Sequence, residues 1–223
     1  GDIPDKFNGY ILPDGHCVSI EDTDALFGLM ISRYENRDMV CGVLRGLFEE
    51  CLDSGLLKAA LSYLGKELSL TDDPQGQARI HLSAGIVFER AGDYQAAATC
   101  YKAAFTLPKE NDEIWYFIHN NLGYCLNQLW RFPEAEWLCL EAIKIDPLRH
   151  NAYKNLGIAF QGQGRYSDAA TCFIQAALIY PLDRRSVVHL EKLLHGHREE
   201  VLREIPNIDE QITLVAELPE RVL

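Results

Sequence analysis

The sequence predicts an all-α protein built from stacked pairs of antiparallel helices. A pattern of an aromatic residue, a Leu-Gly pair, small alanines and a closing proline spans residues 153–181. The same pattern precedes it by 34 residues, since Gly123 is followed by Gly157 and Pro147 by Pro181. A third copy lies further upstream, with Gly85 in the glycine position. One helix pair cannot bury its apolar stripe alone, so neighbouring pairs are expected to stack and form a continuous core.

Small and large residues alternate at the positions where the two helices of a pair meet. Gly157 lies on the first helix and Ala169 near the start of the second, so the two backbones can approach closely. Phe160 and Phe173 then fill the space on either side. Pro181 lacks an N–H and pushes the preceding residue out of the helical region, which ends the second helix. The turns inside the three pairs are expected at residues 91–94, 129–132 and 163–166.

These positions resemble the tetratricopeptide repeat family, whose repeat period and signature they match. The resemblance implies a right-handed α-solenoid of helix hairpins, with an N-terminal arm and a C-terminal capping helix. Residues 74–183 are expected to hold three repeats, at about 78–111, 116–149 and 150–183.

Residues 1–36 are expected to form an arm followed by a helix. The turn signal Pro13-Asp14-Gly15 separates two β-prone stretches and predicts a short hairpin. Ser19, with Asp22 three residues later, predicts a helix cap. The helix that follows carries Leu26 and Met30 on one apolar face.

Residues 37–73 predict a degenerate helix pair that is broken at 53–55. Ala60 and Leu64 suit the small and large positions of its second helix, but the pair lacks a Leu-Gly dipeptide. Such a departure is expected of a terminal unit in a repeat stack.

The spacing from Gly85 to Gly123 is 38 residues, four more than the period. Four residues are about one helical turn. We therefore expect a longer first helix in the second repeat, capped by Asn111 and starting near Asp112. A longer connecting loop is the alternative.

Residues 184–223 predict a capping helix and a C-terminal tail. The helix is expected over 184–203 and is ended by Pro206. A capping-box pattern at Asn207 and Glu210 predicts a last short helix that runs through Glu217 and stops at Pro219. The apolar segment 211–223 is expected to pack on the last helices, and occupation of a groove is the alternative.

Composition excludes several classes of function. The 223 residues carry a net charge of −12, which disfavours the phosphate neutralisation that nucleic-acid binding requires. No apolar run approaches the roughly 20 residues that span a bilayer, so membrane insertion is not expected. The seven cysteines show no C-x-x-C spacing and are expected to be reduced packing residues of a cytoplasmic protein. Because the chain opens with Gly1, a preceding segment in a longer protein stays an open alternative.

No catalytic or cofactor-binding motif is present, so neither an enzyme nor a cofactor is predicted. His195-Gly196-His197 is interpreted as surface histidines rather than half of a metal site. Among the tryptophans, Trp130 and Trp137 are expected to pack within the fold. For Trp115, packing and ligand contact are equally favoured.

The remaining candidate for function is a groove. In tetratricopeptide arrays the first helix of each pair lines the concave surface, so the resemblance implies a site for a peptide or protein segment there. Asparagine and glutamine amides suit such a site, since they supply donors and acceptors without a charge to desolvate. The residues expected to bind a partner are Arg79, Phe117, Asn120, Asn121, Tyr124, Asn127, Asn151, Lys154, Asn155 and Gln161.

Two known modes of recognition in the family match this chain unequally. The carboxylate clamp of chaperone-binding domains implies basic residues across three repeats, and here only Lys154 matches, with Ile158 in the place of the companion asparagine. The asparagine row of O-GlcNAc transferases is the nearer analogue, because Asn121 and Asn155 stand 34 residues apart. We expect them to be equivalent, exposed rungs for a peptide backbone, with satisfaction of neighbouring protein groups as the equal alternative.

The sequence therefore predicts a non-enzymatic adaptor or scaffold that binds a protein or peptide partner of open identity. A secretion-type chaperone that holds an unfolded client is one alternative. A regulatory or targeting domain of a larger protein is the other. The oligomeric state is left open.

Overall fold

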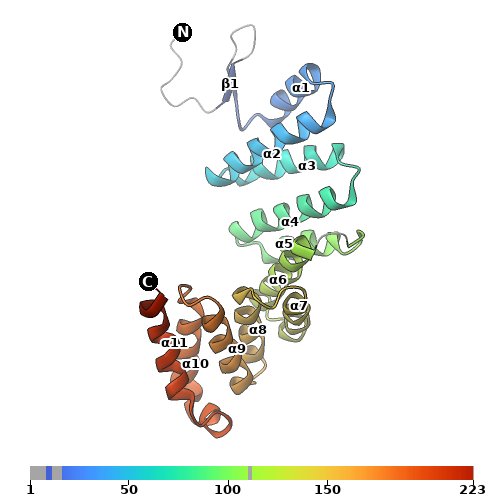
Figure 1. Cartoon of the computed structure of the whole chain (residues 1–223). Helices are drawn as coiled ribbons and strands as arrows, with labels where there is room; N and C mark the ends of the chain where they lie inside the picture. The colour runs from blue at the N-terminus through green and yellow to red at the C-terminus, as the bar shows by residue number, and fades with distance from the viewer. Residues whose placement is uncertain (1–8, 12–16, 110–111, 223) are drawn as a thin grey trace. The chain divides into compact units, whose positions relative to one another are not determined.

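The computed structural model describes residues 9–11, 17–109 and 112–222. Within them the chain forms a two-stranded hairpin and eleven helices, labelled in Figure 1. It divides into two compact units. Unit 1 comprises residues 1–93 and 103–108, and unit 2 comprises 94–102 and 109–223. Each unit has its own hydrophobic core.

Unit 1 begins with the predicted hairpin. Strands β1 (Gly9–Ile11) and β2 (Cys17–Ser19) pair antiparallel, with Tyr10 opposite Val18. The expected turn at residues 13–15 lies outside the described residues. An isolated hairpin is marginally stable in water, and Val18 and Ile20 join the core of unit 1.

Helix α1 (Thr23–Arg33) is capped by a different residue from the one expected. The Asp22 carboxylate accepts from the Ala25 N–H at 3.2 Å, whereas the Ser19 hydroxyl accepts only from the Glu21 N–H. Asp22 is therefore the cap, because its side chain lies three residues before the N–H that needs a partner. Leu26 and Met30 are buried, as the apolar face predicts.

The degenerate helix pair forms as predicted. Helices α2 (Arg37–Asp53) and α3 (Leu57–Leu70) pack on each other, and Gly55 in the turn takes a φ of +74°. Ala60 and Leu64 are buried between neighbouring helices. Helix α4 (Pro74–Arg90) starts with proline, whose missing N–H costs nothing at a helix start, and it packs on α3.

One hydrogen bond ties α3 to the strand segment. The buried Tyr63 hydroxyl donates to the Ile20 carbonyl at 2.6 Å. Tyr63→Phe leaves that carbonyl buried without this donor and should lower the free energy of unfolding by about 1–2 kcal/mol, measured by urea denaturation. The control Tyr34→Phe alters an exposed tyrosine and should change the free energy by less than about 0.5 kcal/mol. Equal effects of the two substitutions would contradict the anchoring role.

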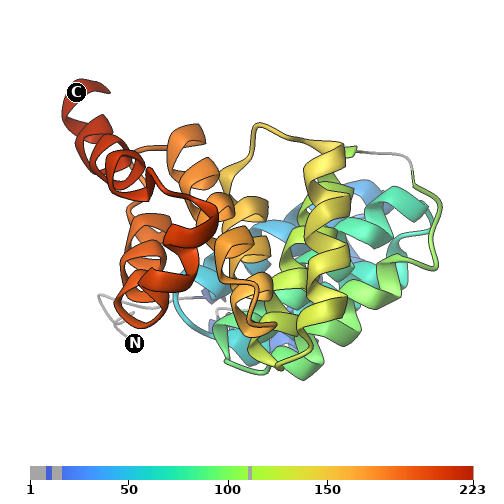
Figure 2. The same ribbon diagram turned by 90° about the horizontal axis from the view of Figure 1, so that it is seen from below.

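Unit 2 is a succession of packed helices. Along the chain, α6 contacts α7, α7 contacts α8, α8 contacts α9, and α9 contacts α10 and α11. Figure 2 shows the last helices, orange to red, lying alongside one another. Residues 94–102 of α5 also belong to unit 2. The bounds are α5 (Tyr94–Ala104), α6 (Asp112–Gln128), α7 (Phe132–Ile145), α8 (His150–Gly162), α9 (Tyr166–Ile179), α10 (Arg185–Glu204) and α11 (Ile208–Val222).

Close approach at the repeat glycines is confirmed. A Cβ placed on Gly157 would lie 2.6 Å from the ring of Phe173, and one on Gly123 would lie 2.9 Å from Cys139 Sγ. Cys139, Phe173 and Ala169 are fully buried. The small and large positions read from the sequence therefore describe real contacts between paired helices.

The longer first helix of the second repeat is also confirmed. Helix α6 starts at Asp112, 11 residues before Gly123, whereas α8 starts at His150, 7 residues before Gly157. Asp112 and Glu113 lie in the first turn, where negative charge is favoured by the helix dipole. The expected cap Asn111 lies outside the described residues.

The expectation for two tryptophans is wrong. Trp130 is 80% exposed and Trp137 is 56% exposed. Trp130 takes a φ of +61° at the turn position that Gly92 and Gly164 occupy in the other pairs, and this left-handed conformation directs it away from the core. Trp115 is buried, which favours packing over ligand contact.

The C-terminal segment packs on the last helices, as expected. Ile208 and Val215 of α11 are buried in the core of unit 2. Helix α10 is kinked at His197, where φ is −133°. The expectation that Pro219 ends the last helix is wrong, because α11 continues to Val222. A proline removes one intrahelical hydrogen bond, and here the backbone stays helical without it.

Candidate functional site

Nine of the ten predicted site residues lie on helices α6 and α8 of unit 2. The exception is Arg79, which is exposed on α4 of unit 1. Helices α6 and α8 are the first helices of consecutive pairs and they contact each other. The term "α6–α8 face" is used here for the half-buried and charged residues along them and the start of α10. Its members are Phe117, Asn121, Tyr124, Asn151, Lys154, Gln161 and Arg185.

Three of the predicted amides are buried and hold α6 to α8. Asn155 Nδ2 donates to Asn120 Oδ1 at 3.0 Å and lies 3.4 Å from the Asn120 carbonyl. Asn127 Nδ2 donates to the Asn155 carbonyl at 2.8 Å. Asn120 Nδ2 in turn donates to Asn121 Oδ1 at 2.9 Å. The network joins neighbouring repeats, which is the alternative role that the sequence left open for these amides.

Asn121 and Asn155 are therefore not equivalent rungs in this structure. Asn155 is 3% exposed, whereas Asn121 is half-buried. Asn155 has α6 against it, and its amide donors go to that helix.

The buried network should contribute to stability rather than to binding alone. Asn155→Ala removes the donor to Asn120 and should lower the free energy of unfolding by about 1–3 kcal/mol, measured by urea denaturation. Gln161→Ala is the control on the same helix, since Gln161 is only half-buried. A melting temperature of Asn155→Ala equal to that of the wild type would contradict the structural role.

A charged cluster lies where α8 begins and the α9–α10 loop returns. Asp183 accepts from Arg185 Nε at 2.8 Å and from Arg185 Nη2 at 2.6 Å, and His150 Nε2 lies 2.9 Å from its Oδ2. Asn151 Oδ1 accepts from Lys154 Nζ at 3.0 Å and from Arg185 Nη2 at 3.4 Å. Hydrogen bonds from Arg185 hold the pKa of Asp183 well below its usual range.

Lys154 is the most perturbed cation of the cluster. It is 8% exposed, and burial followed by the charge of Arg185 lowers its pKa to about 8. An ammonium group has three N–H donors, and one donates to Asn151. A buried ammonium with unused donors is costly. This position can accept a carboxylate or carbonyl oxygen from a ligand.

Sequence reasoning anticipated part of this cluster. Arg185 stands 34 residues after Asn151, so the repeat period can place it as the next rung. His189 stands 34 residues after Asn155, and burial followed by nearby Lys154 lowers its pKa. Asp183 lies in a loop with no periodic signal, so its part in the cluster came only from the structure.

The other face residues surround this cluster with mixed chemistry. The Arg149 guanidinium lies 4.8 Å from the ring centroid of Phe117, and Tyr124 meets Tyr94 edge to face at 5.8 Å. Aromatic, amide and cationic side chains together suit contact with a peptide, whose backbone and side chains are equally mixed.

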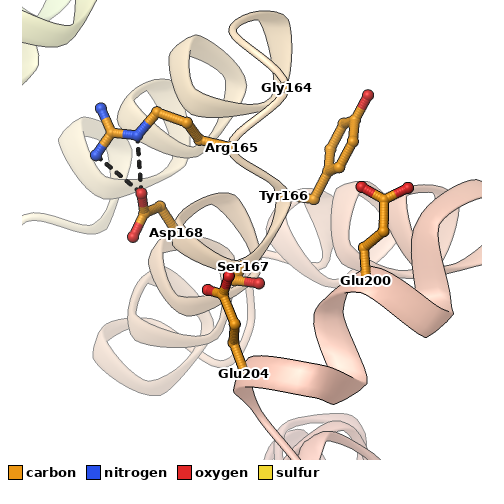
Figure 3. A pocket seen from close by; sticks show the side chains of 7 residues that line it. All are labelled: Gly164, Arg165, Tyr166, Ser167, Asp168, Glu200 and Glu204. Atoms are coloured by element: carbon orange, nitrogen blue, oxygen red, sulfur yellow. Dashed lines mark hydrogen bonds and ion pairs between the residues drawn. The ribbon is translucent and has the colours of Figure 1, made fainter.

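A separate pocket of about 260 Å³ opens at the start of α9 (Figure 3). Glu200 and Glu204 reach it from α10, while Arg165 is held by Asp168 at 2.8 Å and by Glu136 at 2.9 Å. The His197 ring stacks on Tyr166 at 3.5 Å. Within the described part of the chain, no group of three or more His, Cys, Asp and Glu side chains is placed to hold a metal ion.

Comparison with known proteins identifies the repeats. The tetratricopeptide repeat family matches residues 82–150. The chain belongs to the tetratricopeptide repeat family. The solved structure of MamA residues 41-end from Desulfovibrio magneticus RS-1 has the same fold, with a TM-score of 0.63 and 22% identity over 82% of this chain and 96% of that one. A second MamA crystal structure gives a TM-score of 0.60 at 18% identity, covering 78% of this chain and 96% of that one.

Two curated proteins share short tetratricopeptide stretches with this chain. The BBSome complex member BBS4 of Bos taurus is 29% identical over 127 residues, which cover 57% of this chain and 23% of that protein. The O-mannosyl-transferase Tmtc3 of Drosophila melanogaster is 26% identical over 80 residues, which cover 36% of this chain and 9% of that protein. The chain thus matches less than a quarter of the length of either relative. Tetratricopeptide repeat proteins are generally non-enzymatic interaction modules.

No helix in the described residues combines the length and hydropathy needed to cross a bilayer. The six cysteines whose side chains are described are free thiols, and Cys51, Cys125, Cys139 and Cys172 are buried. Burial raises the pKa of Cys51 to about 11 and that of Cys172 to about 12, so both are protonated packing groups.

Proposed function

We propose that this chain is a non-enzymatic protein-interaction module that binds a protein segment on the α6–α8 face of unit 2. The observation that carries the proposal is Lys154. A buried ammonium with unused donors destabilises a fold unless something else needs it. A ligand oxygen would complete its hydrogen bonds, with Arg185 beside it to favour a negative charge.

Surrounding features support a peptide rather than a small molecule. Phe117, Tyr124 and Gln161 extend the face along both helices, over a length that suits an extended chain. The net charge of −12 argues against nucleic acid. The printed name of the bovine relative places that protein in a complex, and a role in assembly fits the same kind of surface.

The compartment follows from the thiols. We propose the cytoplasm, since a reducing environment agrees with free Cys41, Cys51, Cys100, Cys125, Cys139 and Cys172.

The test is selection from a combinatorial library of synthetic peptides whose acidic content and C-terminal charge vary. Wild-type protein should select peptides that share an acidic residue or a free C-terminus. Lys154→Met should weaken binding of the selected peptides about tenfold or more, the usual effect of losing a hydrogen bond to a charged group.

The matched control is Lys144→Met, which removes the same charge from α7, where Lys144 is exposed and pairs with Glu141. Its affinity should equal that of the wild type. Two outcomes would count against the proposal: no selection by the wild type, or equal losses in both variants.

A further inference from the structure

A second polar pocket lies in unit 1, apart from the α6–α8 face. It has a volume of about 460 Å³ and lies between the first half of α2, the end of α3 and the start of α4. Arg79, the predicted site residue outside unit 2, lines it. So do the exposed carboxylates of Asp38, Asp72 and Asp73.

At this pocket lies a buried carboxylate that is only half satisfied. Glu67 is 4% exposed, and Arg45 donates to its Oε1 through both Nε and Nη2. Its other oxygen, Oε2, is buried and has no hydrogen-bond partner among the described residues. An ionised carboxylate accepts on two oxygens, and a buried acceptor left without a donor costs free energy.

Charge favours a donor of positive sign. Unit 1 contains 8 Lys and Arg against 16 Asp and Glu, a net charge of −8 out of −12 for the whole chain. Of the pocket's arginines, Arg45 is held by Glu67 and Arg37 by Asp72 at 3.1 Å. Cations are therefore drawn toward this unit, and two of the positive charges at the pocket are already neutralised.

We infer that this pocket binds a positively charged side chain, a guanidinium or an ammonium, presented by a partner protein. The cation donates to Glu67 and is attracted by Asp38 and Asp72 at the rim. An arginine suits the site better than a lysine, since its five donors can serve two carboxylates at once. The inference does not depend on the α6–α8 face, which lies in unit 2.

The experiment uses the full chain labelled with ¹⁵N and titrated with N-acetyl-arginine amide. The backbone amides of Gly42 and Gly76 line the pocket and report binding. Both should shift saturably with N-acetyl-arginine amide and more weakly with N-acetyl-lysine amide. N-acetyl-glutamine amide and N-acetyl-glutamate amide should leave them in place.

Two substitutions test the assignment of the carboxylate. Glu67→Gln keeps an acceptor for Arg45 but removes the charge, so it should weaken the arginine probe about tenfold. Asp38→Asn changes an exposed rim residue that leaves the core intact, and it should weaken binding about two- to threefold. Glu49→Gln, an exposed carboxylate of α2 that does not line the pocket, is the control and should have no effect.

If Glu67→Gln fails to fold, Asp38→Asn and the comparison of probes still decide the question. Saturable shifts with the glutamate probe would overturn the inference, because they would make the pocket an anion site built on Arg79. The absence of saturable shifts with either basic probe, or equal binding by wild type and Asp38→Asn, would also overturn it.

Discussion

Gly157→Leu should lower the free energy of unfolding by about 3 kcal/mol, the upper range for overpacking a closed core. Even a single Cβ at this position meets the Phe173 ring at 2.6 Å, and that ring is fully buried between α8 and its neighbours. Neither helix can move away without opening the core of unit 2. Urea denaturation followed by circular dichroism measures the loss.

The control for this substitution is Gly65→Ala. Gly65 is exposed on α3, and a Cβ there would meet nothing within 4 Å. Because alanine is the better helix former, Gly65→Ala should raise the free energy of unfolding by about 0.5–1 kcal/mol. If Gly157→Leu proved as stable as the wild type, the contact between paired helices at Gly157 would be refuted.

Lys154→Met should raise the free energy of unfolding by about 2 kcal/mol at pH 7, because it removes a buried ammonium whose pKa is lowered to about 8. The gain depends on pH in a defined direction. Folded wild type releases this proton near pH 8, whereas the unfolded chain releases it near 10.5. Wild-type stability therefore rises between these values, and the advantage of the variant shrinks there.

Thermal denaturation of both proteins from pH 7 to pH 10.5 measures this difference. Lys144→Met serves as the control, since Lys144 is exposed and its removal should change stability by less than about 0.5 kcal/mol. A Lys154→Met variant that is less stable than wild type would mean that Lys154 is a structural cation paired with Asp183. A gain in stability with a loss of binding is the combination expected of a residue kept for function.

The repeat architecture could be predicted from the sequence because its determinants are local. Gly123 and Gly157 mark close contacts by their period, and four extra residues before Gly123 became one more helical turn in α6. Gly55 and Gly164 take the left-handed backbone that their turns require. Trp130 defied prediction because it occupies the same kind of turn with a residue that rarely adopts positive φ.

The site was harder to predict, because burial depends on neighbouring elements. Asn121 and Asn155 hold the same place in the repeat, yet only Asn155 is buried by its contacts with α6. Period alone cannot distinguish an amide that binds a ligand from one that joins two helices. Asp183 lies in a loop, and only the fold brings it to Arg185 and His150.

The most direct test of the proposed function is the pH dependence of peptide binding. An acidic peptide selected from the library should bind wild type with an affinity that is constant up to about pH 8 and falls above it, as Lys154 loses its proton. Isothermal titration calorimetry from pH 6.5 to pH 9.5, in buffers of equal ionic strength, gives the profile. Lys154→Met should bind weakly and without this decline. A wild-type affinity that stays constant across the whole range, or a variant that keeps the same decline, would contradict contact between the ligand and Lys154.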